Sequence, residues 1–267
     1  MLNHVFDLAL VAYVLALILA AGNLFAPRRL LDGLATLLLL LGVLAVTSYL
    51  GGRWVAAGRA PFSNMFESLV LFAWTIPLVY LVLRARGPIP AALTTTTALL
   101  AVLLLVYASA FHSSEIQPLM PALRSNWLTF HVLSCLLGYG AFAVSFLAAI
   151  GCLGAGRAAN PAHPGNQELF AAIMARTVSF GFLFLTIGIV TGAVWANVAW
   201  GTYWSWDPKE TWSLITWLVY AVFLHGRYLR GWSGRRMAWI SILGFISVLV
   251  TYVGVNYLMK GLHSYAS

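Results

Sequence analysis

Tryptophans gather in one short stretch of this sequence. Residues 195–212 read WANVAWGTYWSWDPKETW and hold five of the eleven tryptophans. The five are Trp195, Trp200, Trp204, Trp206 and Trp212, with Tyr203 among them. Tryptophan favours the interface between a membrane and water, so an aromatic belt is one interpretation. A belt distributes its rings over all helix ends, whereas these rings share one segment. The concentration therefore favours a platform for a large, flat, apolar ligand.

Two histidines are candidates for metal ligation beside this platform. His131 lies about one turn inside an apolar run that starts near residue 127, and His263 lies just after the last apolar run. Two imidazoles that flank a flat aromatic site suit the two axial positions of a haem iron. Zinc would need a third or fourth ligand, and no cysteine or acidic cluster supplies it. On spacing alone, interfacial hydrogen bonding by both histidines stays open as the alternative.

Asp207 and His225 each have two interpretations. Asp207 precedes Pro208 and stands three residues before Glu210, which is the pattern of a helix N-cap, and contact with a ligand is the alternative. His225 follows Glu210 by 15 residues, or about 22 Å along a helix, so it cannot bind the same iron as His131. An ionisable residue at that depth in a membrane is a candidate functional site. An interhelical hydrogen bond is the alternative for His225.

The composition places these residues in a membrane protein. Hydrophobic residues make up 61% of the 267 residues and charged residues 8%, where soluble domains carry roughly 25% charged residues. Apolar runs of about 20 residues can cross a bilayer. Eight such runs cover 5–26, 30–50, 66–83, 89–111, 127–151, 169–195, 209–228 and 237–259. Because the runs are unbroken rather than alternating, we predict an all-α polytopic membrane bundle of about eight helices, forming one domain over 1–267.

The basic residues indicate an orientation for this bundle. Ten Lys and Arg side chains fall at one set of helix ends and five at the other. The richer side is expected to be cytoplasmic, which places both termini and the tryptophan segment outside. The net charge of +8 then follows from topology, and no basic stripe points to a nucleic-acid partner. The N-terminus lacks a signal-peptide pattern, so the first helix is expected to stay.

Two further pairs of residues have structural interpretations. Cys135 and Cys152 fall on one predicted helix, 17 residues apart, or about 26 Å, which excludes a disulfide and leaves them as packing residues. Asn64 and Glu67 open the third predicted helix with the spacing of a capping box. No residue is assigned as a catalytic acid, base or nucleophile, and we expect no internal repeat.

Several stretches carry a resemblance to one family. The run WGTYWSWDPKETWSLITWLVYAVFLH at 200–225 resembles the signature of haem-handling proteins with a tryptophan-rich WWD domain. Three further stretches are similar to the CcsA/ResC type of cytochrome c biogenesis protein: PFSNMFESLVLFAW at 61–74, LRSNWLTFHVLSCLLGYGAF at 123–142 and GLHSY at 261–265. The match covers essentially the whole chain in order, and the WGxYWxWDPKETW run is highly specific for the superfamily.

This resemblance implies a ligand, a partner and a set of site residues. The family binds haem b at the outer face through the WWD loop, with two flanking histidines as axial ligands, and His131 and His263 match those positions. The loop residues of the implied site are Trp200, Tyr203, Trp204, Trp206 and Asp207. A further family histidine matches His225 and contributes to a haem site inside the membrane, paired with a histidine of a CcsB/ResB-type partner subunit. Together the two proteins attach the haem vinyl groups to the cysteines of a CxxCH motif in apocytochrome c.

Three functions are open at this point. The first is the haem-binding subunit of a System II cytochrome c synthase, which acts as a haem lyase only with a CcsB/ResB-type partner because this chain has no such portion. The second is a haem transporter or carrier without lyase activity. The third is a membrane assembly factor that does not handle haem. The expected location is the bacterial plasma membrane, with the thylakoid membrane as the alternative.

Overall fold

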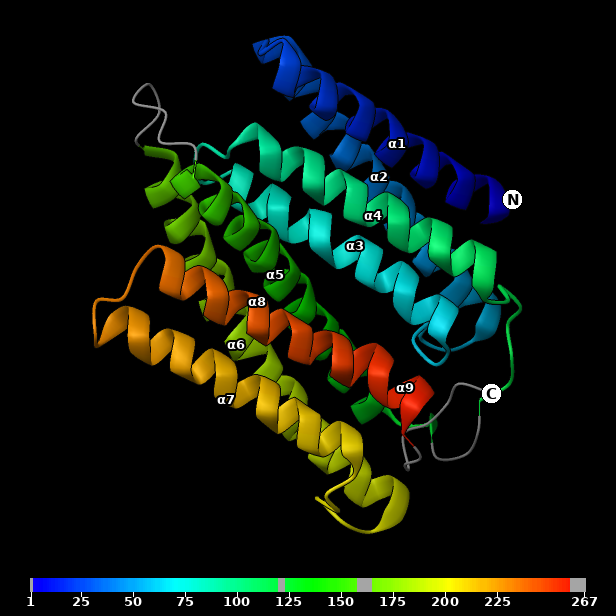
Figure 1. Ribbon diagram of the computed structural model, residues 1–267. Helices are drawn as coiled ribbons and strands as arrows, with labels where there is room; N and C mark the ends of the chain where they lie inside the picture. The colour runs from blue at the N-terminus through cyan, green and yellow to red at the C-terminus, as the bar shows by residue number, and fades with distance from the viewer. Residues whose placement is uncertain (1, 120–122, 158–164, 260–267) are drawn as a thin grey trace. The chain divides into compact units, whose positions relative to one another are not determined.

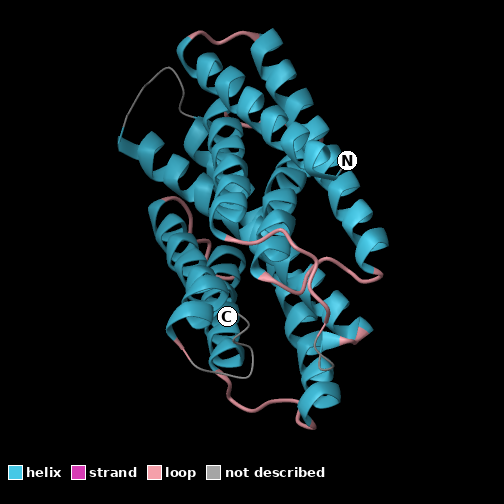
Figure 2. Ribbon diagram, turned by 90° about the vertical axis from the view of Figure 1, so that its right-hand side faces the viewer, coloured by secondary structure: helices cyan, strands magenta, loops and turns pink. Residues whose placement is uncertain are grey.

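The computed structural model describes residues 2–119, 123–157 and 165–259. All regular structure within these ranges is helical, which confirms the predicted all-α class (Figure 2). The helices form two compact units, Met1–Ile116 and Gln117–Ser267.

The first unit holds four helices joined by short connections (Figure 1). They are α1 (Leu2–Phe25), α2 (Arg29–Ala57), α3 (Met65–Arg84) and α4 (Ala91–Phe111). α1 packs most extensively on α2 and then on α4, while α3 packs on α4 and α2. These bounds agree with the predicted runs to within a few residues, except that α2 continues beyond residue 50 to Ala57.

The second unit also holds four helical segments, the last of them interrupted (Figure 1). They are α5 (Asn126–Arg157), α6 (Gly165–Trp200), α7 (Pro208–Tyr228) and a final segment made of α8 (Arg235–Leu249), the π-helical turn η2 (Val250–Gly254) and α9 (Val255–Leu258). α5 packs most extensively on α6 and then on α8, while α7 packs on α8 and α6. The pair formed by α5 and α6 has the most extensive packing among the described elements.

The described helices make this chain an integral, multi-pass membrane protein. Seven of them are long and apolar enough to cross a membrane, with α8, η2 and α9 counted as one span, Arg235–Leu258. The eighth predicted run corresponds to α7, which has 21 residues but falls short in apolar character. Lys209, Glu210 and Arg227 lie within it. Because α7 packs on both α6 and α8, it is nevertheless part of the same bundle.

A buried ion-pair cluster ties together three segments at one end of the first unit. Glu67 of α3 is fully buried, and its two carboxylate oxygens accept hydrogen bonds from Arg53 and Arg59, each at 2.9 Å. Arg53 also donates to the carbonyl oxygen of Ser114, beyond the end of α4, at 2.6 Å. The Asn64 side chain caps α3 as predicted, accepting the Glu67 backbone N–H at 2.8 Å. The Glu67 carboxylate, however, accepts the Ser63 backbone N–H at 3.0 Å and pairs with the two arginines, so the capping-box interpretation was only half right.

The two units follow the same plan around the connection between their second and third helices. In each unit the second helix ends at a glycine with positive φ, Gly58 at 63° and Gly201 at 80°. The N-cap of the third helix comes six residues later in both, at Asn64 and at Asp207. The order of helix packing is also the same in both units.

A tryptophan pair extends this correspondence into the helices. Trp74 of α3 donates its indole N–H to Thr47 of α2 at 2.8 Å, and Trp217 of α7 donates to Thr186 of α6 at 2.9 Å. Both tryptophans lie ten residues after the cap, so the pattern G-x5-[ND]-x2-E-x6-W occurs twice. The expectation of no internal repeat was therefore wrong. The repeat preserves turn chemistry and a few contacts, which overall sequence similarity does not reveal.

Candidate functional site

The connection between α6 and α7 is shorter than the gap between the two predicted apolar runs, which end at residue 195 and begin again at residue 209. α6 continues through Trp200, and α7 begins at Pro208, so the turn consists of residues 201–207. α6 extends beyond its predicted end at residue 195 because its hydrogen-bond ladder runs up to Gly201, whose N–H donates to the Asn197 carbonyl oxygen at 2.9 Å. The positive φ of Gly201 then ends the helix, since a left-handed residue suits this position.

Asp207 begins α7 in the way that the sequence predicted. Its carboxylate accepts the Lys209 N–H at 2.9 Å, and the Glu210 carboxylate accepts the Asp207 N–H at 3.1 Å. The Glu210 backbone N–H also donates to the Asp207 carboxylate, so the Asp207 and Glu210 side chains form a reciprocal capping box. Pro208 occupies the first turn, where it loses no helical hydrogen bond. Glu210 also accepts the Ser205 N–H at 2.8 Å. The charged residues therefore hold the turn in one conformation.

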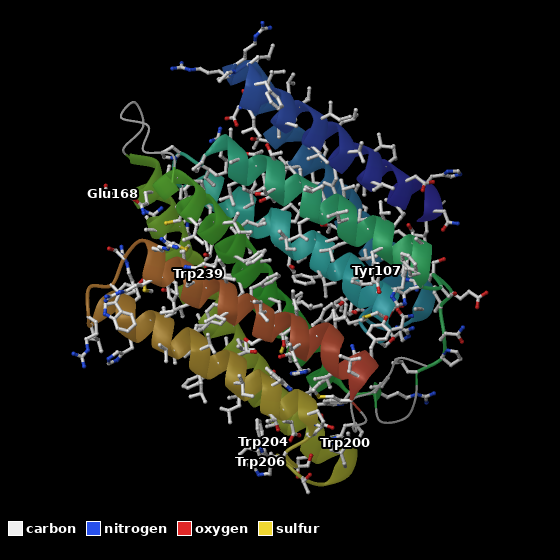
Figure 3. The ribbon with its side chains drawn as sticks, in the orientation of Figure 1. Tyr107, Glu168, Trp200, Trp204, Trp206 and Trp239 are labelled. Carbon is white, nitrogen blue, oxygen red and sulfur yellow. The ribbon has the colours of Figure 1, made fainter. Side chains whose placement is uncertain are left out.

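The tryptophan rings around this turn meet in two pairs, and their burial ranges from full to low. Trp195 is 1% exposed and meets Trp200 edge-on, with their ring centroids 5.1 Å apart. Trp204 and Trp206 meet edge-on at 5.7 Å, and Tyr203 and Trp206 are 61% and 68% exposed. Figure 3 shows Trp200, Trp204 and Trp206 gathered around the turn. The exposed rings of Tyr203 and Trp206 offer apolar surface to a flat ligand.

Trp206 has an unusual backbone conformation. Its φ is 60°, and no other non-glycine residue in the described ranges has a positive φ. A left-handed conformation costs a bulky residue about 1–2 kcal/mol. This strain lies directly before the N-cap Asp207, at a residue whose side chain is exposed. Strain at such a place points to a functional role for the ring.

Replacing Trp206 by glycine should separate stability from ligand binding. We expect Trp206→Gly to keep or raise the unfolding free energy, by up to about 1 kcal/mol, because the strain is removed and the ring buries little surface. Binding of haem, the flat ligand expected from the sequence, should weaken. Thermal melting in detergent and haem titration measure the two effects. Tyr203→Gly is the matched control, since it removes an exposed ring of the same turn without relieving a positive φ. Equal destabilisation by both variants would contradict the assignment of strain.

His131 is held against α6 by its Nδ1 atom. The Nδ1 atom lies 2.7 Å from the Gly188 carbonyl oxygen, and the ring stacks on Trp195 at 16°, with centroids 6.1 Å apart. Because a carbonyl only accepts, Nδ1 must carry the proton, and the lone pair of the neutral ring is on Nε2. This is the arrangement of metal-ligating histidines, in which the second ring nitrogen donates to a carbonyl. The donor chemistry of His131 thus fits an axial ligand of a haem iron.

Glycines allow α5 to approach α6 closely along this contact. A Cβ atom at Gly188 would lie 2.5 Å from the Cys135 sulfur, and one at Gly181 would lie 2.6 Å from the Phe142 ring. Both cysteines are free, as predicted, but Cys135 also contacts the site, with its sulfur 3.7 Å from the His131 Nδ1 atom. The sequence signal for this contact is the spacing of Gly188 and Gly192, which is typical of close helix pairs in membranes. Neither glycine is among the site residues predicted from the sequence.

The other two candidate histidines are not brought to His131 by the described structure. His263 lies outside the described residues. His225 lies in the last turn of α7, at the end opposite the tryptophan turn, and its side chain is exposed. The buried face of α7 is made by other residues, namely Thr216, Tyr220, Phe223 and Gly226. Within the described ranges, no three His, Cys, Asp or Glu side chains gather into a metal site.

Comparison with known proteins agrees with this architecture. Residues 62–263 match the family model described as cytochrome C assembly protein. The chain is 40% identical to the cytochrome c biogenesis protein CcsA of Synechococcus sp. (strain CC9311), with 99% of this chain and 98% of the relative covered. It is also 40% identical to the CcsA of Guillardia theta, with 85% and 83% covered. Among solved structures, cytochrome c haem lyase CcmF has the same fold, with a TM-score of 0.75 and 20% identity over 98% of this chain. This chain corresponds to 47% of the lyase.

The fold and the site define a class of protein: a polytopic helical membrane protein with an aromatic turn between two packed helices and a histidine that stacks on a tryptophan of the helix before that turn. The family match and the relatives make the membership specific. The chain belongs to the cytochrome c assembly protein family and is of the CcsA type. The resemblance stated from the sequence motifs is thereby confirmed.

Proposed function

We propose that this chain is the haem-binding subunit of a membrane cytochrome c synthase, with haem b as its substrate. In this proposal His131 and His263 are the axial ligands of the iron. The ring contacts come from Trp200, Tyr203, Trp204 and Trp206, while Asp207 acts through the turn, because its carboxylate caps α7. The observation that carries the proposal is the His131 imidazole. Its Nδ1–H donates to the Gly188 carbonyl oxygen, and its ring stacks on Trp195, which in turn meets Trp200 at the end of α6.

The proposal places the tryptophan turn and both termini on the outer side of the membrane. The connection at the other end of α7 supports this orientation, because Arg230, Arg235 and Arg236 are exposed there. Arginines in a short loop favour the cytoplasmic side. The membrane would be the bacterial plasma membrane or the thylakoid membrane. On the outer side, the site can meet an apocytochrome c with its CxxCH motif.

The proposed reaction needs positioning more than acid or base catalysis. Each cysteine thiol adds across one vinyl double bond of haem: a C–S bond forms, and the thiol hydrogen ends on the neighbouring carbon. The addition involves no net oxidation or reduction. The thiolate is the reactive form, so the rate depends on how closely the two reactants are held. His131 and the aromatic turn would fix the substrate, and no residue of this chain is assigned as an acid or a base.

A CcsB/ResB-type membrane subunit is the proposed partner, and His225 lies where such a partner could supply a second ligand. The exposed face of α7 carries Ile215, Leu218 and Val222 in line with His225, at helical spacing. A partner helix that packs on this apolar face would meet the imidazole. A haem site in the membrane would then be shared between the two chains.

The absorption spectrum of the detergent-purified chain tests the proposal. We expect a Soret band and sharp reduced bands, which the His131→Ala/His263→Ala double variant loses. His225→Ala is the control, because it leaves the outer ligands in place. A wild-type chain that stays colourless after haem is supplied, even with the partner co-expressed, would contradict haem binding and favour a non-haem assembly factor.

A haem carrier without lyase activity is the second candidate, favoured by the position of His225 far from the turn. Co-expression with a CxxCH apocytochrome, with and without the partner, separates the two functions. The synthase proposal expects haem that stays attached to the apocytochrome after denaturation, and only when the partner is present. Haem bound by the chain but never attached would favour the carrier.

A further inference from the structure

We infer that α6 positions the His131 imidazole through Gly188, Gly192 and Trp195, which we name the α6 cradle. The inference rests on the proposed ligation of iron by His131 and identifies the residues that present its Nε2 atom. The three cradle residues are four and three positions apart, so they share one face of α6. That face meets α5, which carries His131 one turn from its start.

Gly192 leaves the space that the imidazole occupies. A Cβ atom at this position would lie 2.5 Å from the Nδ1 atom and 2.7 Å from the Cε1 atom of His131. Real Cβ atoms essentially never come this close to other heavy atoms. The ring therefore lies directly against the backbone of α6, and any side chain larger than hydrogen must displace it.

Gly188 and Trp195 restrict the orientation of the imidazole ring, the first by a hydrogen bond and the second by stacking. The His131 Nδ1–H donates a hydrogen bond to the Gly188 carbonyl oxygen, with 2.7 Å between Nδ1 and the oxygen, and this bond selects the tautomer and the rotation of the ring. Trp195, itself buried, covers one face of the ring. A histidine near the end of a single helix would sample several rotamers. Here the direction of Nε2 is set by the neighbouring helix.

Cys135 is close to the same atom but does not share this role. Its sulfur lies 3.7 Å from Nδ1, and a thiol sulfur is a weak acceptor, whereas the carbonyl lies at 2.7 Å. The cradle thus predicts that Cys135→Ala leaves the tautomer of His131 unchanged.

The test compares two glycine substitutions in the same helix pair. Gly192→Ala should lower haem affinity about 10–100-fold, the usual effect of disturbing the residues that orient a metal ligand. Its low-spin absorption bands should weaken in parallel. Gly181→Ala is the matched control, since its Cβ atom would meet the Phe142 ring at 2.6 Å and disturb the same interface away from His131. Gly154→Ala, where nothing lies within 4 Å of the added atom, controls for the change of residue itself.

A second readout uses the haem-free chain. Selective 15N labelling of histidine reports which ring nitrogen carries the proton, and His131→Gln assigns the signal. We expect the Nδ1–H tautomer in the wild type and in Cys135→Ala, and a mixture of tautomers in Gly192→Ala. If Gly192→Ala does not fold, Trp195→Leu, which removes the stacked ring without adding volume to the contact, is measured in the same two ways.

Two results would overturn the cradle: an Nε2–H tautomer in the wild type, or a loss of haem affinity in Gly181→Ala as large as that in Gly192→Ala. Failure of the proposed function looks different. In that case His131→Gln binds haem like the wild type, while the tautomer and its dependence on Gly192 are still observed. The two ideas are therefore tested separately.

Discussion

Glu67→Ala is expected to lower the unfolding free energy by about 3–5 kcal/mol, because it leaves two buried guanidinium groups without their counter-charge. Arg53 and Arg59 both pair with this carboxylate, and neither has more than 10% of its side chain exposed. Arg53 also links the cluster to the segment after α4 through Ser114. In a protein of this size the loss corresponds to a fall of roughly 10 °C or more in melting temperature.

The ion pair of Arg84 and Asp32 supplies the control for this prediction. It belongs to the same unit but is partly exposed, with 27% and 23% of the two side chains accessible. Partly solvated pairs contribute about 0–1 kcal/mol, so Asp32→Ala should lower the melting temperature by only a few degrees. Glu67→Gln should lie between the two, since it keeps the volume of the side chain and loses the charge. Equal melting temperatures for Glu67→Ala and Asp32→Ala would show that the buried cluster does not stabilise the unit.

His131→Gly is expected to reduce covalent haem attachment more than about 100-fold when the chain is co-expressed with its partner. Loss of an axial ligand should exceed the 10–100-fold effect typical of residues that only orient one. Added imidazole should restore much of the attachment. The Gly188 carbonyl oxygen and the Trp195 ring remain in this variant and can hold a free imidazole as they hold the side chain.

Rescue by imidazole distinguishes ligation from folding. A variant that lost attachment because α5 and α6 no longer pack would not regain it with a small base. His131→Leu is the matched control, because its side chain fills the site and excludes imidazole. Rescue of both variants to the same extent, or of neither, would contradict the role of His131 as a ligand in this site.

The fold was largely predictable because its signals are local. Long apolar runs determined the helical membrane class, and the helices of both units agree with those runs to within a few residues at most of their ends. The N-cap of α7 was also predictable from the sequence, because its residues Asp207, Pro208 and Glu210 lie within one turn. The repeated turn was missed because the two copies share only a glycine with positive φ, at Gly58 and Gly201, and a helix cap six residues later. The residues between the glycine and the cap differ in the two copies.

By itself, the sequence determined the class of protein, the family motifs, and the residue types available to hold a haem. Only the tertiary structure decided how those residues are presented. His131 and Gly188 are 57 positions apart, and Arg53 and Ser114 are 61 apart. No periodicity or capping rule links residues at such separations, because the contacts depend on how closely two helices pack. Glycines such as Gly192 set the distance between the two helices, because they have no side chain to hold the helices apart. This role is visible only when the neighbouring helix is in place.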